Sequence, residues 1–526
     1  MRRPHQQHTG MLSLAIAAPF VVLAVWNIWS PYSYWLDEIF SVSVSSEGWA
    51  QFRISMLNDV HPPLYQTVLK GWILLFGTGE TQTRSLSLVF SLVTLASLLR
   101  FMRDRDRVLA MATIAFFVSS FLFVYYSQET RSYAMLLMFS TLGFFLYMEG
   151  THTSGARQRT VWYLLLLALS LTHYFGLVLA GILLLADLVS VRHIKGVIER
   201  VLVGAVLLVY PLIHLSFGSI LNRTGGHLWI TSDGIHSTLL TFSSAHLRPF
   251  HETIERIPYL SATAGYIALA AGILALLIWF SRIAGHAQRR ALFKAAAIVL
   301  SFVAVMAAID LHTPMSTRRN YIVLLPPMAL MYGLVVQAFW NTYRGRFLQF
   351  ILILAVTGHV LASAYVSYRM MENRWAPRQD WKGLAEIVQR EGLCSPHCWF
   401  FGGPGPRMYT FYFAPDMGPD PAQAVLSLEA LADLREEQRR PVIAVNIWPN
   451  TLQALRTHYT GWSCHAPPQS RMNGAYILVK GHASIPGLEA CPDPDQSQGE
   501  RQGHGLSAAR TRGHQGPLPG RSWVLR

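Results

Sequence analysis

Residues 11–40 read MLSLAIAAPFVVLAVWNIWSPYSYWLDEIF, an apolar run that is followed closely by two adjacent carboxylates. The run at 11–29 is close to the roughly 20 residues that an α-helix needs to cross a bilayer. Asp37 and Glu38 come a few residues after it ends. The stretch therefore predicts a transmembrane helix with an acidic pair at the edge of the membrane.

The composition of the whole chain is that of a membrane protein. Of its 526 residues, 52% are hydrophobic and 14% are charged, whereas about 25% of the residues of a soluble domain are charged. Further apolar runs follow at 84–100, 108–125, 133–148, 161–174, 175–190, 201–218, 261–281, 292–309, 321–340 and 347–365. With the first run, they predict a mainly α, polytopic membrane protein with about eleven transmembrane helices.

The formal net charge of +14 agrees with such a topology. In a soluble protein it would suggest nucleic-acid binding, but here Lys and Arg concentrate in short loops between apolar runs, as the positive-inside rule requires. These loops share the cytoplasmic side with Arg2 and Arg3 only if residues 61–77 lie along the interface. We therefore expect residues 61–77 to be juxtamembrane, the N-terminus to be cytoplasmic, and no nucleic acid to be bound.

The polar clusters all fall on the extracytoplasmic side of this topology, which predicts one site built from several loops. One of the two carboxylates, Asp37 or Glu38, is a candidate general base whose pKa is tuned by apolar neighbours, and the other would orient it or help to hold a cation. The alternative is that both carboxylates only cap or solvate a short interfacial helix, because acidic residues are favoured near helix starts.

Two cationic loops flank the acidic pair. The segment YYSQETRSY contains Glu129 and Arg131, and HTPMSTRRNY contains Arg318 and Arg319. Arginine suits phosphate because it can donate two parallel hydrogen bonds. The pattern indicates a negatively charged leaving group beside a proton acceptor. The alternative for Arg131 is a salt bridge to Glu129 or to another loop carboxylate.

The chain carries six motifs in order, LDE, HPPLY, YSQETRSYAM, THYFG, RRNYIVLLPPMAL and RQDWKGLAEIV. Together they resemble the bacterial GT-C glycosyltransferases of the protein O-mannosyltransferase and aminoarabinose transferase superfamily, glycosyltransferase family 39. The resemblance implies transfer of a sugar from a polyprenyl-phosphate donor on the outer face of the membrane, with inversion and without a nucleotide cofactor. It also implies that Asp37 is the base with Glu38 in support, that Arg131 binds the donor phosphate, and that Arg319 and Tyr321 form the family's Arg–Tyr pair.

Two histidines raise the question of a divalent metal cation. His61 and His173 lie at the outer ends of apolar segments, and imidazole with the carboxylate of Glu38 or Glu129 suits zinc or manganese. No paired ligand spacing supports such a site, which favours structural roles for both histidines. The expected substrate-binding residues are His61, Tyr65, Glu129, Arg131, Tyr133, His173, Arg318, Arg319 and Tyr321.

Composition divides the chain into three regions. Residues 1–366 form the expected transmembrane catalytic domain, and 367–484 a small periplasmic α/β domain that would select the acceptor. In the second region, DWKGLAEIVQREG predicts an amphipathic helix, and CWFFGG, PVIAVNIWP and GAYILVKGH predict short strands. Residues 485–526 are rich in Pro, Gly, Gln, Arg and Ser, which predicts a disordered tail.

All four cysteines lie beyond the last apolar run, at Cys394, Cys398, Cys464 and Cys491. An oxidising compartment predicts a disulfide among them, and the sequence leaves the pairing open. A metal site built on the CxxxC spacing is the alternative.

Two other classes of membrane protein also have many spans. A transporter or flippase would carry ionisable residues at mid-span or in broken helices, whereas this chain keeps its charges mostly at span ends. A glycan polymerase or ligase would carry a larger outer loop than the roughly 40 residues found between spans here. These features favour a transferase over both classes. The resemblance implies a place in the bacterial inner membrane, and the acceptor can be a lipid, a glycan or a protein.

Overall fold

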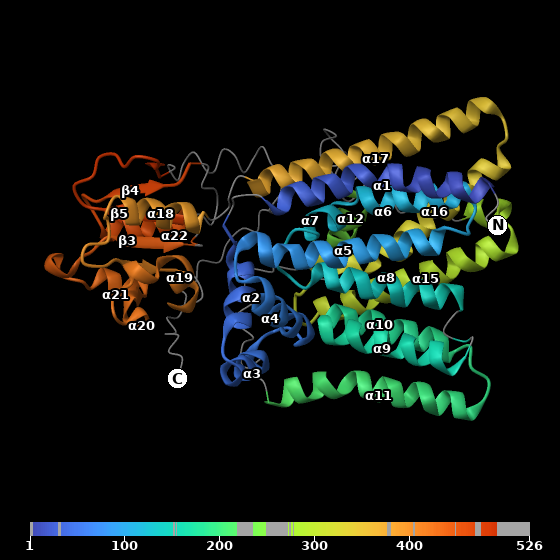
Figure 1. Cartoon of the computed structure of the whole chain (residues 1–526), viewed down its shortest axis with the longest axis horizontal. Coiled ribbons are helices and arrows are strands. Elements are labelled where there is room, and N and C mark those ends of the chain that lie inside the picture. Colours follow the sequence, from blue (N-terminus) through green and yellow to red (C-terminus); the bar gives the residue numbers. More distant parts are fainter. Residues whose placement is uncertain are drawn as a thin grey trace.

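Figure 1 shows the computed structural model of the chain, a bundle of long helices with an α/β domain at one end. The structure describes residues 4–29, 33–150, 153, 155–217, 235–248, 272, 275–276, 278–375, 380–402, 406–445, 447, 449–468 and 475–491. The chain is mostly helical, and its one described sheet belongs to the α/β domain. This agrees with the predicted fold class.

The bundle is built from apolar helices that run largely side by side (Figure 1). They are α1 (Pro4–Ile28), α5 (Glu80–Met102), α6 (Arg107–Ser119), α7 (Phe121–Tyr126), α8 (Tyr133–Glu149), α9 (Ala156–Thr172), α10 (Tyr174–Leu188), α11 (Ile194–Phe217), α12 (Ile235–His246), α15 (His286–Asp310), α16 (Leu325–Thr342) and α17 (Arg346–Trp375). Large apolar side chains such as Leu202, Leu300 and Phe347 are exposed on it. Such an apolar outer surface suits contact with lipid.

Five segments of the described chain are long and apolar enough to cross a membrane. They are Glu80–Met102, Ile194–His214, His286–Asp310, Arg318–Thr342 and Arg346–Arg369. Shorter apolar helices accompany them, at Met11–Trp26, Leu64–Phe76, Arg107–Ser119, Tyr133–Glu149 and Tyr174–Leu188.

Helix breaks alter two of the predicted spans. The run 108–125 is divided at Ser120, whose Oγ accepts the N–H of Leu122 at 3.3 Å and begins α7. The run 321–340 begins as a 3-10 helix, η3 (Arg318–Leu324), before α16 continues it. Most of the predicted span 261–281 lies outside the described residues.

Three short helices, α2 (Leu36–Ser46), α3 (Trp49–Asn58) and α4 (Leu64–Phe76), lie at the end of the bundle nearest the α/β domain (Figure 1). At 13 residues α4 is shorter than the roughly 20 residues of a transmembrane helix. The buried Lys70 Nζ donates to the carbonyls of Ser45, at 3.3 Å, and Glu47, which ties α4 to the end of α2. The juxtamembrane position expected for residues 61–77 stays a prediction.

The α/β domain contains a six-stranded mixed sheet in the order β2-β1-β3-β5-β4-β6. Strand β1 is parallel to β2 and β3, and the other pairs are antiparallel. The elements are α18 (Trp381–Arg390), β1 (Trp399–Phe401), α19 (Pro406–Phe413), η4 (Ala414–Asp416), α20 (Pro421–Ala424), β2 (Val425–Leu426), α21 (Leu428–Ala432), η5 (Glu436–Gln438), β3 (Val442–Val445), α22 (Pro449–His458), β4 (Ser463–Ala466), β5 (Ala475–Val479) and β6 (Glu489–Ala490).

The predicted helix and strands of this domain are confirmed, and their burial explains why the pattern was readable. Helix α18 buries Trp381, Leu384, Ala385 and Val388, the i, i+3, i+4, i+7 spacing of one helix face. Strands β3 and β5 are buried along their whole length, as expected for central strands that are covered on both faces.

Two predicted boundaries differ from the structure. The boundary between 366 and 367 falls inside α17, which continues to Trp375. The tail predicted from residue 485 begins too early, because Ile485 is buried and Glu489–Ala490 form a strand beside β4. Residues 492–526 lie outside the described residues.

The cysteines form two disulfides, Cys394–Cys398 and Cys464–Cys491. The expected disulfide is therefore confirmed, and the metal site considered for the CxxxC spacing is wrong, because both of its sulfurs are bonded to each other. The second disulfide joins β4 to the segment after β6 and so holds residues of the predicted tail in the domain.

Candidate active site at the junction of the bundle and the α/β domain

Asp37 and Glu38 lie in the first turn of α2, where the positive end of the helix dipole stabilises carboxylates. Successive side chains of a helix point about 100° apart, so the two carboxylates meet different surroundings. The Asp37 side chain is 26% exposed, while Glu38 is fully buried. The two adjacent acids therefore have different roles.

The Glu38 carboxylate binds groups from two other segments. Arg84 of α5 donates from Nε to Oε1 at 3.0 Å and from Nη2 to Oε2 at 2.8 Å, which is a bidentate pair. The backbone N–H of Thr130 donates to Oε1 at 2.9 Å. Glu38 thus joins α2 to α5 and to the loop that carries Arg131.

The Asp37 carboxylate faces two arginines from distant parts of the chain. Arg319 of η3 donates from Nη1 to Oδ2 at 2.9 Å, and Nη2 of Arg131 lies 3.8 Å from the same oxygen. Arg131 is held in place because its Nη1 donates to Ser41 Oγ at 2.8 Å and to the Asp37 carbonyl at 3.2 Å. The structure brings the predicted base and two of the predicted arginines into one cluster.

The charge of the arginines decides the protonation state of Asp37. Burial by itself raises the pKa of this carboxyl, but Arg131 and Arg319 outweigh it through their charges and the Arg319 hydrogen bond. The net effect is a pKa below the usual value of an aspartate. Asp37 is therefore ionised at neutral pH and can accept a proton.

Aromatic rings hold Arg319 in position. Its guanidinium carbon lies 5.7 Å from the centre of the Tyr133 ring and 5.9 Å from that of Trp35, within the range of a cation–π interaction. Tyr133 is almost fully buried. Tyr133, predicted to bind substrate, therefore supports the arginine next to Asp37.

Tyr321 is placed differently from Arg319, with which it was expected to act. It is fully buried, and its hydroxyl lies 3.0 Å from Ser316 Oγ. Its backbone carbonyl is 3.0 Å from His246 Nε2, and its ring meets the Phe242 ring at 5.8 Å. These contacts fix η3 to α12, so Tyr321 supports the helix that carries Arg319.

Glu129 shapes the loop before Arg131. Its backbone carbonyl accepts hydrogen bonds from Ser87 Oγ at 2.5 Å and from the Arg131 N–H at 2.7 Å. Its side chain is buried. Among the ion pairs of the described residues, Arg131 pairs with Asp37 and not with Glu129. The salt bridge of Arg131 is thus made to a carboxylate of a different loop.

His61 and His173 face each other with ring centres 4.8 Å apart. Nδ1 of His173 accepts the N–H of Phe175 at 3.3 Å and caps α10, and Nδ1 of His61 lies 3.3 Å from Asp59 Oδ1. Within the described ranges, no group of three or more His, Cys, Asp or Glu side chains could hold a metal ion. The residues there do not fit the divalent cation considered from the sequence.

The two other predicted substrate-binding residues lie in different environments. Tyr65 of α4 is buried among apolar side chains that include Leu69 and Met135. Arg318 precedes Arg319 in η3 and is partly exposed. The Tyr65 ring therefore contributes to packing, and its hydroxyl lies close enough to Arg131 and Glu38 for their charges to act on it. Arg318 adds a second positive charge next to Arg319.

The chain is similar to two crystal structures of ArnT from Cupriavidus metallidurans. The apo structure is 13% identical, with a TM-score of 0.52 over 88% of this chain and 97% of that one. The structure bound to undecaprenyl phosphate is 14% identical, with a TM-score of 0.53 over 91% of this chain and 99% of that one. The chain has a GT-C fold. Its sequence matches no family model and no curated protein.

The GT-C fold surrounds the cluster with polar residues that the sequence did not single out. Arg84 is the first residue of the predicted span 84–100, and a charged residue in an apolar segment is itself a signal of function. Asp59 is buried beside His61. Ser41 and Thr130 carry no comparable signal, because their roles depend on contacts with residues far away in the sequence.

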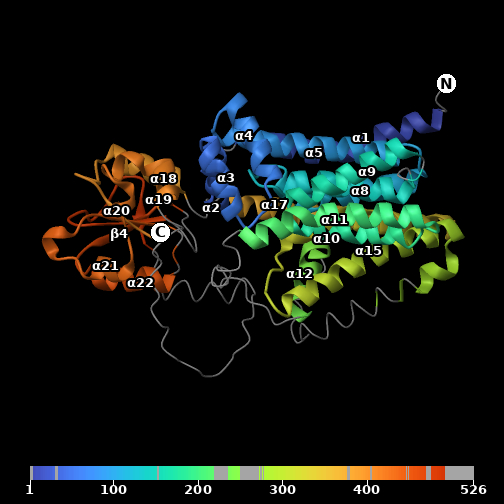
Figure 2. The same cartoon turned by 90° about the horizontal axis from the view of Figure 1, so that it is seen from below.

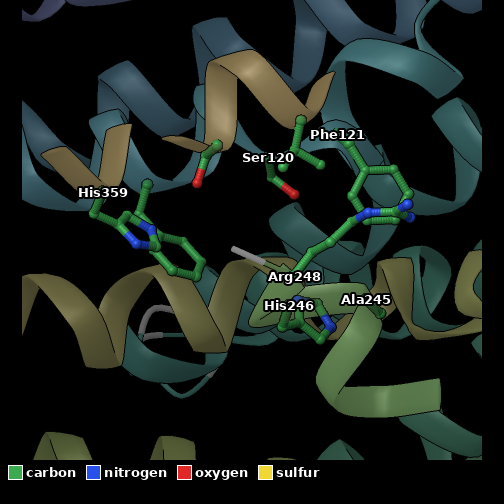
Figure 3. A pocket seen from close by; sticks show the side chains of 9 residues that line it. Ser120, Phe121, Ala245, His246, Arg248 and His359 are labelled. Atoms are coloured by element: carbon green, nitrogen blue, oxygen red, sulfur yellow. The ribbon is translucent and has the colours of Figure 1, made fainter. Parts of the chain in front are cut away.

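A small cavity in the GT-C bundle is separate from this cluster (Figure 3). Its volume is about 20 Å³, which is room for a single water molecule. Ser120, His246 and His359 are among the side chains that line it, and they come from the break after α6, from α12 and from α17. Asp37 and its arginines do not line this cavity.

Proposed function

We propose that the chain is an integral membrane glycosyltransferase that moves a sugar from a polyprenyl-phosphate donor to an acceptor hydroxyl at the extracytoplasmic face, with inversion. The observation that carries the proposal is the pair of arginines, Arg131 and Arg319, at one oxygen of Asp37. This arrangement offers a proton acceptor beside two phosphate-binding groups. The similarity to an ArnT structure bound to undecaprenyl phosphate supports a polyprenyl-phosphate partner.

In the proposed reaction, the acceptor oxygen attacks the anomeric carbon of the sugar from the side opposite the phosphate. The glycosidic C–O bond forms while the bond from that carbon to the phosphate oxygen breaks, and the electron pair leaves with the polyprenyl phosphate. Asp37 takes the proton of the acceptor hydroxyl. Arg131 and Arg319 stabilise the charge that grows on the leaving phosphate, so no carboxylic acid is needed to protonate it.

Donor binding would also strengthen the base. Arg131 and Arg319 lower the pKa of Asp37 while their charge acts on this carboxylate alone. A donor phosphate between the same guanidinium groups shares that charge, and the pKa of Asp37 then rises toward its ordinary value. Asp37 therefore becomes a better proton acceptor when the leaving group is in place.

The other predicted residues around Asp37 and its arginines differ in their exposure to solvent. His61 and Arg318 are partly exposed, and we assign them contacts with the donor sugar or its phosphate. Three further predicted residues are buried and would hold those contact residues in position: Tyr65, Tyr133 and His173. The donor brings its own lipid phosphate, so no nucleotide is required, and the acceptor is a lipid, a glycan or a protein hydroxyl.

The test uses the full-length protein in detergent with synthetic polyprenyl-phosphate sugars. We expect acceptor-dependent release of polyprenyl phosphate by the wild type, and roughly 100- to 10,000-fold less by Asp37→Asn. Mass spectrometry of envelope lipids and glycans from a deletion strain then identifies the acceptor. Movement of the donor across reconstituted vesicles without sugar release would indicate a flippase instead, and a ladder of extended glycans would indicate a polymerase.

A further inference from the structure

The α/β domain shares a hydrophobic core with α2, the helix that carries Asp37. Ile39 and Val42 of α2 belong to the same buried cluster as Trp381 of α18 and Phe413 of α19. Figure 2 shows α18 and α19 on the side of the domain that faces α2. The domain is therefore packed directly against the helix of the candidate active site.

Tyr412 of α19 forms the polar part of this contact. Its hydroxyl accepts the backbone N–H of Tyr34 at 3.0 Å and donates to Glu80 Oε1 at 2.9 Å. Lys382 Nζ of α18 lies 3.9 Å from the same Glu80 oxygen. Because Tyr34 lies three residues before Asp37, Tyr412 fixes the backbone just before the first turn of α2.

Hydrogen bonds continue from Tyr34 to the loop that carries Arg131. The Tyr34 hydroxyl lies 2.5 Å from Thr83 Oγ1, and this oxygen lies 2.9 Å from Thr130 Oγ1. The backbone N–H of Thr130 in turn binds Glu38. An uninterrupted series of contacts therefore runs from the α/β domain to both sides of the cluster.

We infer that Tyr412 is a positioning residue for Asp37, through which the α/β domain holds the start of α2 against the loop of Arg131. The inference rests on the proposed transferase function. It gives the domain a role in turnover in addition to the acceptor selection expected from the sequence. Tyr412 acts through Tyr34 and does not touch the reacting atoms.

The expected effect falls on kcat and not on donor affinity. Reaction requires the carboxylate at a fixed place relative to the acceptor hydroxyl, and a displacement of about 1 Å can cost about 100-fold in rate. Loss of one hydroxyl loosens α2 without displacing it fully, so a decrease in kcat of about tenfold is expected. Donor binding depends on Arg131 and Arg319. Each keeps a support outside the first turn of α2, because Arg131 donates to Ser41, one turn further along the helix, and Arg319 lies over the Tyr133 ring.

Tyr409→Phe is a matched control for Tyr412→Phe. Tyr409 belongs to the same helix, but its hydroxyl donates to the carbonyls of Phe401 and Gly402, at 2.7 and 2.6 Å, inside the α/β domain. Each substitution removes one hydroxyl from α19, and of the two hydroxyls it is that of Tyr412 which binds the segment just before α2. In both full-length variants we would measure kcat, the Kd for undecaprenyl phosphate, and amide hydrogen exchange across residues 36–46.

Tyr412→Phe is expected to lower kcat about tenfold, to leave the Kd unchanged, and to speed amide exchange at the start of α2. Tyr409→Phe is expected to lower thermal stability without changing exchange in α2. Equal exchange in α2 of both variants, or a kcat of Tyr412→Phe equal to that of the wild type, would overturn the inference. If the wild type transfers no sugar, the proposed function fails, while the exchange data still decide whether Tyr412 holds α2.

Discussion

Two ion-pair clusters begin from neighbouring residues of α2 and differ in how far they enclose the acid. Glu38 is fully buried and receives two hydrogen bonds from Arg84 and one from the Thr130 backbone. Asp37 is 26% exposed, and Arg131 and Arg319 meet at a single one of its oxygens. We call Glu38 with Arg84 the closed cluster, because its carboxylate is shielded from solvent. We call Asp37 with Arg131 and Arg319 the open cluster, because its carboxylate is partly exposed.

The difference separates a group that holds the fold from a group that can react. An ion removed from water loses several kcal/mol of hydration, which is offset only by good geometry and a full set of partners. Glu38 and Arg84 meet this requirement. Asp37 keeps part of its surface exposed. Under the proposed function, its arginines bind the donor phosphate in exchange for this carboxylate. Guanidinium groups suit that anion because they can donate two parallel hydrogen bonds to a phosphate.

The largest effect is expected for Asp37→Asn. Removal of the proton acceptor should lower turnover by roughly 100- to 10,000-fold. The affinity for undecaprenyl phosphate should not decrease, because both arginines remain and the Asp37 carboxylate no longer competes with the phosphate for them. Single-turnover kinetics with a polyprenyl-phosphate sugar measures the rate of turnover, and a direct binding experiment measures the Kd. A variant that turns over at nearly the wild-type rate would remove Asp37 from the mechanism.

A change in the closed cluster should act on stability instead. Glu38→Gln leaves the buried Arg84 without its charged partner, a loss of about 3–5 kcal/mol in the free energy of unfolding. We expect a clearly lower Tm in detergent for Glu38→Gln, and a smaller decrease for Asp37→Asn, whose carboxylate is partly exposed. The double variant Glu38→Leu with Arg84→Met should recover much of the loss, since no charge is then stranded. Equal Tm values for Glu38→Gln and Asp37→Asn would contradict the contrast between the clusters.

The residues of the open cluster could be predicted from the sequence more easily than the Glu38–Arg84 pair of the closed cluster. Asp37, Arg131 and Arg319 stand in loops next to apolar runs, where each charge is conspicuous. Arg84 stands at the edge of a predicted span, and its partner Glu38 lies 46 residues earlier. No local pattern links two such residues, because the pairing arises only when α2 packs beside α5.

The fold shows the same division between local and long-range information. Hydropathy predicted most of the long helices, and side-chain spacing predicted α18 and strands β1, β3 and β5. The break at Ser120 depends on one capping bond, and the pairing of Cys464 with Cys491 depends on the sheet that brings them together. Composition alone also placed residues 485–491 in the tail, although the disulfide and β6 hold them in the domain.

Arg131 offers a way to sharpen the role of the open cluster. Arg131→Ala should raise the KM for the donor and also lower kcat, each by about tenfold, because a phosphate ligand acts before and during bond breaking. Lys should rescue the loss only in part, since a point charge cannot replace a planar two-pronged contact. The measurement is initial rates over a range of donor concentrations.

The double variant Arg131→Ala with Glu129→Ala is the control for a local ion pair. Arg131 pairs with Asp37 and not with Glu129 among the described residues, so removal of Glu129 should restore nothing. Recovery of activity in the double variant, with a donor KM close to that of the wild type, would count against the phosphate role.

The smallest effect is expected from pH, and it tests how the arginines control Asp37. The kcat/KM of the wild type should stay level as pH falls from 7, because the pKa of Asp37 in the free protein lies below its usual value. Its ion pairs likewise stabilise the fold above the unfolded-state pKa of about 3.9 and are lost only as pH falls through the lower folded pKa. Arg319→Gln removes one charge and one hydrogen bond, so the acid limb of its normalised profile should move to higher pH. Arg318→Gln, which changes the adjacent arginine, should move the acid limb less.

The wild-type profiles also test whether donor binding changes the base. If the donor phosphate takes over the contacts of Arg131 and Arg319 with Asp37, the acid limb of wild-type kcat should lie at higher pH than that of kcat/KM. Coincident limbs in the two profiles would show that donor binding leaves the base unchanged.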